Sequence, residues 1–188
     1  LDDTVDIIEE MPANVVKRIL RQTDSEMRSE INKILNYPKD SAGSIMTIEY
    51  VDLKAEMTVS QAFERIRSTG VDKETIYTCY VTDANRHLMG ITTVKDLLLS
   101  NPQIKIGDMM ETNVIFVDTF EDKVVVANLF DKYDFLAMPV VDKETRLVGI
   151  ITVDDVIDVL QEEHTEDIEK MAAITPSEKP YLKTSIWD

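Results

Sequence analysis

Acidic side chains dominate one stretch near the C-terminal end of the chain, and their chemistry is that of cation ligands. Residues 154–169 contain eight carboxylates and no Lys or Arg. Thr152 is expected to cap a long helix here. At about 100° per residue, such a helix brings five of these side chains within roughly 80° of one another: Asp155, Asp158, Glu162, Glu166 and Glu169. Carboxylate oxygens are hard ligands, so this stripe is a candidate divalent-cation surface.

Two interpretations of the stripe stay open, because an exposed helix face is ordinarily polar and Glu is a good helix former. Against a merely solvated face, two like charges about 6 Å apart repel by roughly 0.7 kcal/mol in water, and by more near a protein surface. No cation relieves this repulsion before Lys170, whereas bound ions would. The opposite side of the helix is expected to pack, and it contains Val156, Ile157, Leu160, Ile168 and Met171.

A second pattern, Thr-x-x-Asp, occurs twice, each time directly after an apolar segment. Thr93 stands three residues before Asp96, and Thr152 stands three residues before Asp155. This spacing resembles a capping box at a helix N-terminus, where a cap contributes about 1 kcal/mol. The same helix end attracts anions. Lys95 favours an anion in the first copy, whereas a second carboxylate directly precedes Asp155 in the other.

Other arrangements that support catalysis or tight metal binding are missing from the sequence. His87 and His164 are far apart and have no second Cys or His nearby, which argues against a zinc site. No glycine-rich phosphate loop and no Ser/His/Asp arrangement occurs, so we do not expect an enzyme. Cys79, the single cysteine, lies in an apolar run, where we expect a core thiol in a reducing compartment.

Composition excludes several classes of partner. The chain of 188 residues contains 36 Asp and Glu against 20 Lys and Arg, for a formal net charge of −16. This charge argues against nucleic acid and against anionic lipid, since both need clustered cations. No apolar stretch approaches the roughly 20 residues that cross a bilayer, so we expect a soluble polypeptide. Because it starts at Leu1, the chain looks like a fragment of a longer protein.

An internal repeat organises the elements that must position these side chains. Residues 89–96 match residues 148–155, and residues 80–83 match residues 139–142, both at an offset of 59. Further upstream, Ile45-Met46 pairs with Met109-Met110. The first copy has a longer insertion near residues 70–75. Two α/β lobes joined pseudo-symmetrically are therefore predicted.

Each copy predicts the order strand, helix, strand, strand, helix. The expected strands cover residues 50–53, 76–81 and 87–91 in the first copy, and 114–117, 137–141 and 147–151 in the second. The expected first helices cover residues 59–68 and 124–133, and a Thr-capped helix closes each copy. Residues 1–40 instead predict three short helices with apolar stripes. Because such helices are marginal alone, this segment is expected to belong to a stacked helical array.

The repeat resembles a known family. Two copies of apolar strand, Asp turn, Gly-Ile-x-Thr-x-x-Asp and helix are similar to a tandem CBS-domain pair, or Bateman module, over about residues 43–164. Residues 37–47 resemble the junction between the helical N domain and the CBS pair of MgtE-type magnesium transporters, as do residues 163–168 and 180–187. The implied fold class is α+β, with two β-α-β-β-α lobes after a short all-α segment. The implied domains are a partial helical N domain (1–40), CBS domain 1 (41–102), CBS domain 2 (103–164) and a linker leading to the plug helix (165–188).

The resemblance also implies ligands. In this family Mg²⁺ binds between the CBS lobes, the N domain and the plug helices. Positions that match implicate Asp155, Glu163, Glu166 and Asp167 as metal ligands, with Asp134 and Asp158 in support. Acids near the N-terminus are further candidates to share ions: Asp2, Asp3, Asp6, Glu9 and Glu10. In CBS proteins generally, the Thr-x-x-Asp pattern implicates Thr93, Asp96 and Thr152 in binding ATP or AMP, with Thr toward phosphate and Asp toward ribose.

The function implied by the resemblance is that of a cytosolic Mg²⁺-sensing region, which regulates a magnesium channel or transporter at the cytoplasmic face of the cell membrane. Mg²⁺ would close an acidic CBS homodimer and hold the plug helices against the pore. The implied partners are Mg²⁺ ions, a second copy, and the protein's own transmembrane domain and plug helix. The alternative is a soluble adenine-nucleotide-sensing CBS module. A third interpretation, a purely structural helical adaptor, predicts neither ligand.

Overall fold

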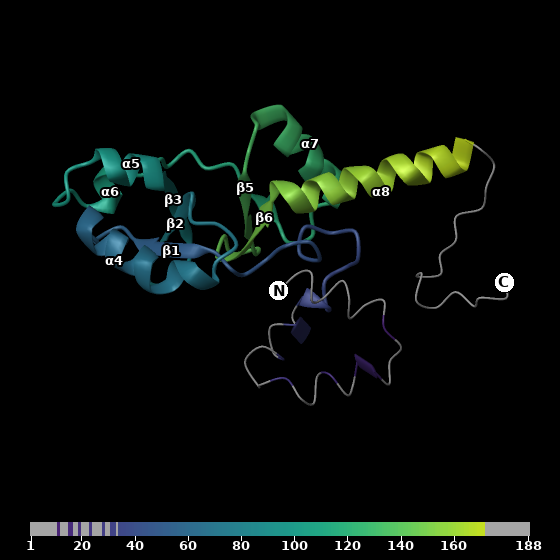
Figure 1. Ribbon diagram of the computed structural model, residues 1–188, viewed down its shortest axis with the longest axis horizontal. Coiled ribbons are helices and arrows are strands. Elements are labelled where there is room, and N and C mark those ends of the chain that lie inside the picture. The colour runs from purple at the N-terminus through teal and green to yellow at the C-terminus, as the bar shows by residue number, and fades with distance from the viewer. Residues whose placement is uncertain are drawn as a thin grey trace.

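Two mixed lobes lie next to each other in the computed structural model of the protein, and one long helix extends away from the second lobe (Figure 1). The structure describes residues 11, 15–16, 19, 23, 28, 31–32 and 34–171, except the side chains of 166 and 169–171. Each lobe has the order β-α-β-β-α, which confirms the predicted α+β tandem fold. The candidate acids of residues 1–10 and the linker beyond residue 171 lie outside the described residues.

The first lobe contains a three-stranded sheet in the order β1-β2-β3. Its elements are β1 (Val51–Lys54), α4 (Val59–Thr69), the 3-10 turn η1 (Gly70–Asp72), β2 (Thr78–Thr82), β3 (Leu88–Thr93) and α5 (Val94–Leu99). β1 pairs with β2 in parallel, and β2 pairs with β3 antiparallel. A parallel pair needs a crossover, which α4 supplies, starting at a capping box between Thr58 and Gln61.

The second lobe repeats this topology after a short connecting helix, α6 (Ile106–Met109). Its elements are β4 (Val117–Asp118), α7 (Lys123–Tyr133), β5 (Ala137–Val141), β6 (Leu147–Thr152) and α8 (Val153–Met171). β4 covers only the end of the strand predicted over residues 114–117. Val117 pairs with Val140, so the preceding residue would face Pro139, which has no N–H to donate to the ladder. In the first lobe Tyr80 occupies the position of Pro139, and β1 is longer.

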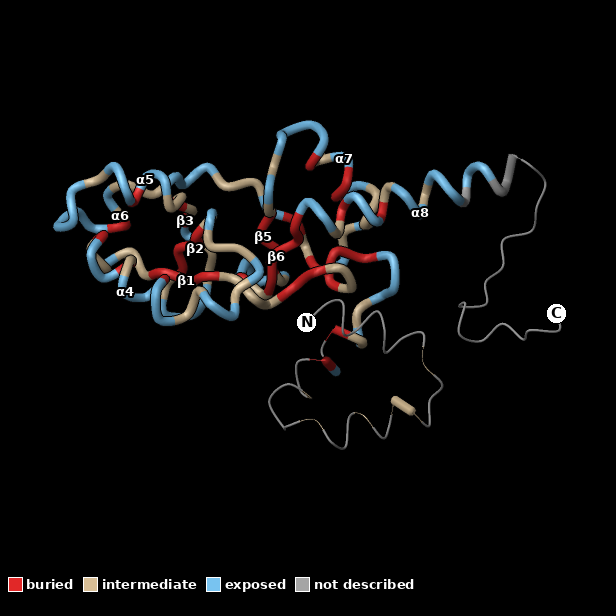
Figure 2. Tube along the Cα trace, viewed as in Figure 1, coloured by how far each residue is buried: buried red, intermediate tan, exposed pale blue. Residues whose placement is uncertain are grey.

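Alternation along the strands builds the core of each lobe. In β1, Val51 and Leu53 are buried, whereas Asp52 and Lys54 on the other face are partly exposed (Figure 2). The first core cluster contains Val51, Leu53, Val59, Ala62, Ile66, Cys79, Val81, Leu97 and Ile106. Cys79 is buried in this cluster, so the prediction of a core cysteine is confirmed, and burial raises the pKa of its thiol to about 12.

Each copy opens with a segment that crosses to the other lobe. Thr47 exchanges two backbone hydrogen bonds of 2.8 Å with Ile150 of β6, and Glu111 exchanges two of 2.9 Å with Ile91 of β3. As a consequence, Met46 belongs to the core of the second lobe. Met110 packs against the core of the first. The repeated pairs Ile45-Met46 and Met109-Met110 therefore belong to the segments that join one lobe to the other.

This crossing explains why each copy contains a Gly-Ile pair shortly before its Thr-x-x-Asp pattern, Gly90-Ile91 in the first and Gly149-Ile150 in the second. A Cβ on Gly90 would lie 2.7 Å from the Glu111 carbonyl oxygen and 2.9 Å from Met110 Sδ. A Cβ on Gly149 would lie 2.9 Å from the Thr47 carbonyl oxygen and 2.7 Å from Met46 Sδ. Only a residue without a side chain lets the crossing backbone approach this closely.

The lobes also meet through their hairpins. Leu88 N donates to the Thr145 carbonyl at 3.1 Å, and Leu147 N donates to the Arg86 carbonyl at 2.9 Å. Arg86 and Thr145 occupy equivalent positions and both have positive φ, at 71° and 60°. The left-handed conformation therefore belongs to the turn itself rather than to a ligand site. Between the sheets, Tyr80, Leu147 and Ile150 form a buried cluster.

α8 is continuous from Val153 to Met171, and it does not break near His164. Val156 and Val159 are buried, as expected of a packed face, but Ile157 and Ile168 are 47% and 66% exposed. The prediction that those two pack was wrong for the single chain, because the helix presents one narrow face to α7 and then extends past the lobe (Figure 2). No helix in the described ranges is long and apolar enough to span a membrane.

Candidate cation and anion sites

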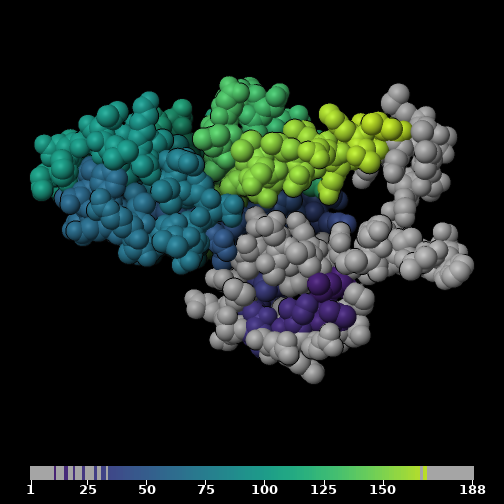
Figure 3. Space-filling model, in the orientation of Figure 1, coloured from purple at the N-terminus to yellow at the C-terminus, as the bar shows by residue number. Residues whose placement is uncertain are grey.

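The predicted metal ligands are distributed along α8 and at the end of α7. Asp155 lies in the first turn of α8 and is half-buried, and Asp158 is exposed one turn later. Glu163 is half-buried, Asp167 is exposed, and Glu166 lies on the same helix, but its side chain is outside the described set. In Figure 3 this part of α8 crosses the molecular surface and continues beyond the second lobe.

Asp134 ends α7 in a left-handed conformation, with φ of 54°, and its side chain is exposed. Two residues later, the Leu136 carbonyl accepts a hydrogen bond of 3.1 Å from Val153 N. Asp134 therefore belongs to the same end of the lobe as Asp155. The candidates divide into this pair near the start of α8 and a second group, around Glu163 and Asp167, near its far end.

The length of α8 keeps the two groups apart. At about 1.5 Å rise per residue, Asp155 is about 12 Å from Glu163 and about 18 Å from Asp167 along the axis. Mg²⁺ holds its ligands at about 2.1 Å, so a single ion cannot reach both groups. Among the described residues, no three His, Cys, Asp or Glu side chains converge as a metal site does. An ion bound here would use one or two of these carboxylates and complete its shell with water or with other surfaces.

Lys123 is a cation at this site that sequence analysis missed. Its Nζ lies 3.2 Å from Asp40 Oδ1 and 3.1 Å from Glu162 Oε2, and its side chain is 12% exposed. Burial alone would lower the pKa of this ammonium, but the hydrogen bonds and charges of Glu162 and Asp40 outweigh burial and raise the pKa. Lys123 thus ties the segment before the first lobe to α7 and α8. No local pattern reveals this contact, because its members are far apart in the sequence.

The Thr-x-x-Asp pairs form the predicted helix caps. Asp96 N donates to Thr93 Oγ1 at 3.1 Å, and Thr93 N donates to Asp96 Oδ2 at 3.3 Å, which completes a capping box on α5. Thr152 makes matching contacts, since its N and Oγ1 donate to Asp155 Oδ2 at 3.3 and 2.7 Å.

Access to the two caps differs, because Thr152 is only 5% exposed and Thr93 is half-buried. Asp96 and the neighbouring Lys95 are exposed. The first cap is therefore the one that an anion can reach, and its lysine would attract that anion.

Two protein-family models match the sequence. The CBS-domain model matches residues 42–100 and 106–162, and the MgtE intracellular N domain model matches residues 1–40. The two CBS ranges each contain one sheet with its two flanking helices.

Two curated relatives that cover most of this chain are magnesium transporters by description. The magnesium transporter MgtE of Thermus thermophilus is 41% identical over 178 residues, which are 93% of this chain and 39% of that protein. The Bacillus subtilis magnesium transporter MgtE is 39% identical over 96% of this chain and 41% of its own length. This chain thus spans about two fifths of the length of these relatives. A crystal structure of the cytosolic domain of the Mg²⁺ channel MgtE in complex with ATP matches with a TM-score of 0.81 and 40% identity, over 84% of this chain and 65% of that one.

Proposed function

The chain belongs to the CBS-domain family, as a tandem CBS pair preceded by an MgtE intracellular N domain segment, and we propose that it is the cytosolic regulatory region of a magnesium transporter or channel. It would lie at the cytoplasmic face of the membrane and respond to Mg²⁺. Its homology to MgtE transporters over 93% of its length supports this assignment.

The observation that carries the proposal is the exposed acidic surface of α8. Asp154, Asp158 and Asp167 are exposed and make no ion pair within the described residues, while Glu162 is paired with Lys123. Like charges in this arrangement repel, so any conformation that brings α8 close to another acidic surface is unfavourable without counter-ions. Mg²⁺ supplies that positive charge when bound. Once Mg²⁺ neutralises these carboxylates, α8 would pack against the elements that face it, which is the closed form. The equilibrium between open and closed forms would shift by the difference between their affinities for Mg²⁺.

A second copy of the chain is the protein partner that we propose. Leu98 and Leu99 of α5 are 67% and 79% exposed, and Val153 and Ile157 of α8 are 36% and 47% exposed. Isolated exposed apolar residues are ordinary, but these pairs lie on the closing helices of equivalent lobes, where a homodimer would cover both. The transmembrane domain and plug helix implied by the MgtE relatives are further partners in this proposal.

Adenine-nucleotide binding is a second candidate function, favoured by one observation. The first cap combines an accessible Thr93, an exposed Asp96 and an exposed Lys95, and a relative at 40% identity has a structure with ATP. We place a nucleotide phosphate at the N-terminus of α5, with Asp96 toward the ribose. Calorimetry with ATP and AMP tests this, because Asp96→Asn should weaken binding at least tenfold while Asp72→Asn leaves it unchanged.

Thermal unfolding with and without millimolar Mg²⁺ tests the main proposal. A ligand that binds only the folded state raises the melting temperature, and we expect a rise of a few degrees. The charge-neutral double variant Glu166→Gln with Asp167→Asn should lose most of that rise. The matched control, Glu56→Gln with Asp72→Asn, removes two exposed acids from the first lobe and should respond like the parent. If both double variants respond alike, the acids of α8 are not the ligands.

A further inference from the structure

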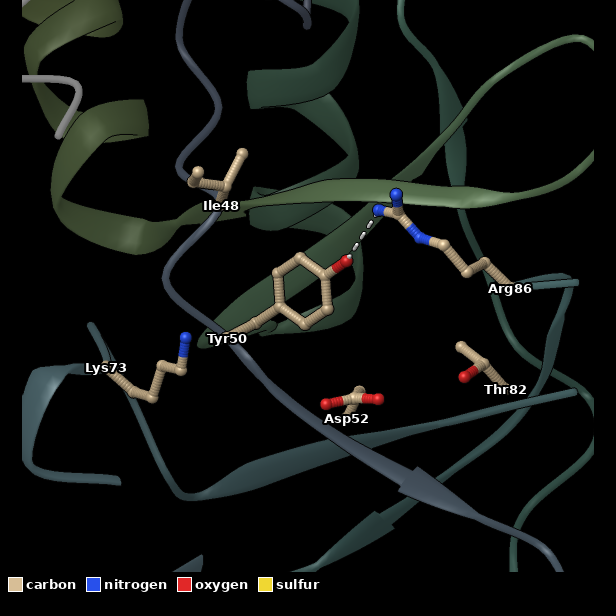
Figure 4. Close-up of a pocket in the computed structure, with 6 residues that line it drawn as sticks. All are labelled: Ile48, Tyr50, Asp52, Lys73, Thr82 and Arg86. Carbon is tan, nitrogen blue, oxygen red and sulfur yellow. Dashed lines mark hydrogen bonds between the residues drawn. The ribbon is translucent and has the colours of Figure 1, made fainter. Parts of the chain in front are cut away.

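A pocket of about 250 Å³ opens on the face of the first sheet that points away from α4. Its lining comes from β1, β2 and three connecting segments: Ile48, Tyr50, Asp52, Lys73, Thr82 and Arg86. In Figure 4 the Tyr50 ring lies between the Lys73 and Arg86 side chains. None of these residues belongs to the cap at Thr93, and none belongs to the acidic surface of α8.

The polar groups of the pocket are mostly hydrogen-bond donors. One terminal nitrogen of Arg86 donates to the Leu147 carbonyl at 2.9 Å and contacts the Tyr50 hydroxyl at 3.3 Å. These contacts hold the guanidinium at the rim and leave its other N–H groups available. Lys73 is half-buried, and its ammonium forms no ion pair with any described residue. Two cations beside one small cavity are unexpected in a chain of net charge −16.

Asp52, the acid of the pocket, is already neutralised by its own lobe. Its Oδ1 accepts a hydrogen bond of 2.7 Å from Arg65, and its Oδ2 lies 3.7 Å from Lys54 Nζ. Burial alone would raise the pKa of Asp52, but the hydrogen bond and charge of Arg65, together with the charge of Lys54, outweigh it and lower the pKa. Among the lining residues, the two cations Lys73 and Arg86 therefore stand beside a single carboxylate that is already paired.

The second lobe supplies an internal control for the pocket. By strand register, Phe116, Val141 and Thr145 occupy the positions of Asp52, Thr82 and Arg86. Lys73 has no counterpart at all, because it follows η1, the insertion by which the first copy is longer. The second lobe thus keeps the same fold without a charged group at any of these positions, and Lys73 in the first lobe forms no ion pair with a described acid.

We propose that this pocket binds a compact organic oxyanion, a phosphate monoester or a carboxylate, held between Lys73 and Arg86. Arg presents a planar fork of donors that matches both kinds of oxyanion, and Lys adds a mobile point charge. Tyr50 and Ile48 offer an apolar wall for the organic part. The volume lies below the roughly 300–1,000 Å³ of common ligand sites, so it suits a metabolite of a few carbons rather than a whole nucleotide. This site goes beyond the proposed Mg²⁺ response and does not depend on it.

Calorimetric titration of the 188-residue chain, in buffer without Mg²⁺, tests the site. Glycerol 3-phosphate serves as the phosphate ester, malate as the carboxylate, and inorganic phosphate as the anion without an organic part. Lys73 forms no ion pair with a described residue, so Lys73→Gln leaves no such carboxylate unpaired. The melting temperature of this variant should therefore match that of the parent. Lys105→Gln is the matched control, because it removes one exposed lysine from the region outside the pocket.

The site predicts saturable binding of one equivalent of at least one organic probe, with affinity at least tenfold lower in Lys73→Gln and within twofold of the parent in Lys105→Gln. Tighter binding of glycerol 3-phosphate than of malate, or the reverse, identifies the ligand class. Equal losses in the two lysine variants would reveal non-specific attraction, and absence of saturable binding for either organic probe would also overturn the site. If Asp96→Asn lowers the affinity for the probe as much as Lys73→Gln does, the anion binds at the α5 cap, and the proposed pocket site is wrong.

Discussion

The two lobes have the same chain path but differ in where their charged side chains gather. In the first lobe, cations gather around the sheet and the α5 cap: Lys54, Arg65, Lys73, Arg86 and Lys95. In the second lobe the corresponding helix is α8, which has 19 residues against six in α5 and carries the acidic surface. Both lobes therefore make the same backbone contacts, whereas the charged residues on their surfaces differ.

The positions that hold the same residue type in both lobes are those where the backbone geometry accepts few residue types. The crossing segments need Gly90 and Gly149, and the closing helices need Thr93 and Thr152 as caps. The positions that differ lie at helix ends and in the longer loop of the first copy. We infer that the first lobe serves anions and that the second serves cations.

The largest effect is expected from the two crossing glycines. Gly90→Ala and Gly149→Ala each place a Cβ under 3.0 Å from a backbone oxygen, so each should lower the free energy of unfolding by about 1–3 kcal/mol. Urea denaturation measures this loss. Gly70→Ala is the control, because a Cβ there meets only side chains, those of Ile76 at 3.0 Å and Ile66 at 3.7 Å. A loss in one lobe alone would mean that the two crossings are not equivalent.

Lys123 has no counterpart in the first lobe, and its removal should destabilise the protein more than removal of Lys105, an exposed lysine that forms no ion pair with a described residue. Lys123→Gln leaves the exposed carboxylates of Asp40 and Glu162 without their shared cation, so we expect a loss of about 1 kcal/mol. Millimolar Mg²⁺ should restore part of this loss by screening the same acids. Chemical denaturation of Lys123→Gln and Lys105→Gln, each with and without Mg²⁺, measures both effects. Equal behaviour of the two variants contradicts the proposed role of Lys123.

The helix caps separate a structural role from a binding role. Thr93→Ala and Thr152→Ala should each cost about 1 kcal/mol of stability, because each removes a cap hydroxyl. Only Thr93→Ala should also weaken ATP or AMP binding, since the Thr152 hydroxyl is buried. Parallel calorimetric and denaturation measurements on the two variants test this difference. Loss of nucleotide affinity in Thr152→Ala would assign the anion to the second lobe instead.

The smallest effect concerns the Asp52–Arg65 pair of the first lobe. The folded-state pKa of Asp52 is lowered, so its ionised form contributes stability above the unfolded value of about 4, and this contribution is lost as pH falls through the folded value. Asp52→Asn should therefore be less stable than the parent at pH 7, by about 0.5 kcal/mol, and equally stable near pH 2. Denaturation midpoints at both values measure the convergence, with Asp108→Asn as an exposed control.

Local sequence patterns predicted most of the backbone. The offset of 59 located both hairpins, and β5 was predicted over its observed range, because alternation and capping act within a few residues. β4 was predicted too long, since the missing N–H of Pro139 acts across strands and not along them. The exchange of opening segments was not predicted either, although the paired methionines and glycines that make it stand in the sequence.

The candidate site was less predictable, because it depends on contacts between distant residues. Lys123 reaches Asp40 and Glu162 only after α7 and α8 pack. The pocket of the first lobe likewise joins Tyr50, Lys73 and Arg86 from three segments that no spacing connects. For α8, helical periodicity separated acidic from apolar residues but could not show how much of the apolar side finds a partner. Ile157 stays exposed because only one narrow face of α8 packs against the lobe, and Ile168 stays exposed because α8 has extended past the lobe at that point.

Residue-resolved NMR titration with Mg²⁺ tests the division between the lobes most directly. We predict saturable shifts of backbone amides along α8, at Asp155, Asp158, Glu163, Glu166 and Asp167, and at Asp134 beside it. Amides around Lys73 and Arg86 should not move until an oxyanion is added. Shifts that grow linearly with Mg²⁺ at every exposed acid of both lobes, without saturation on α8, would contradict the account.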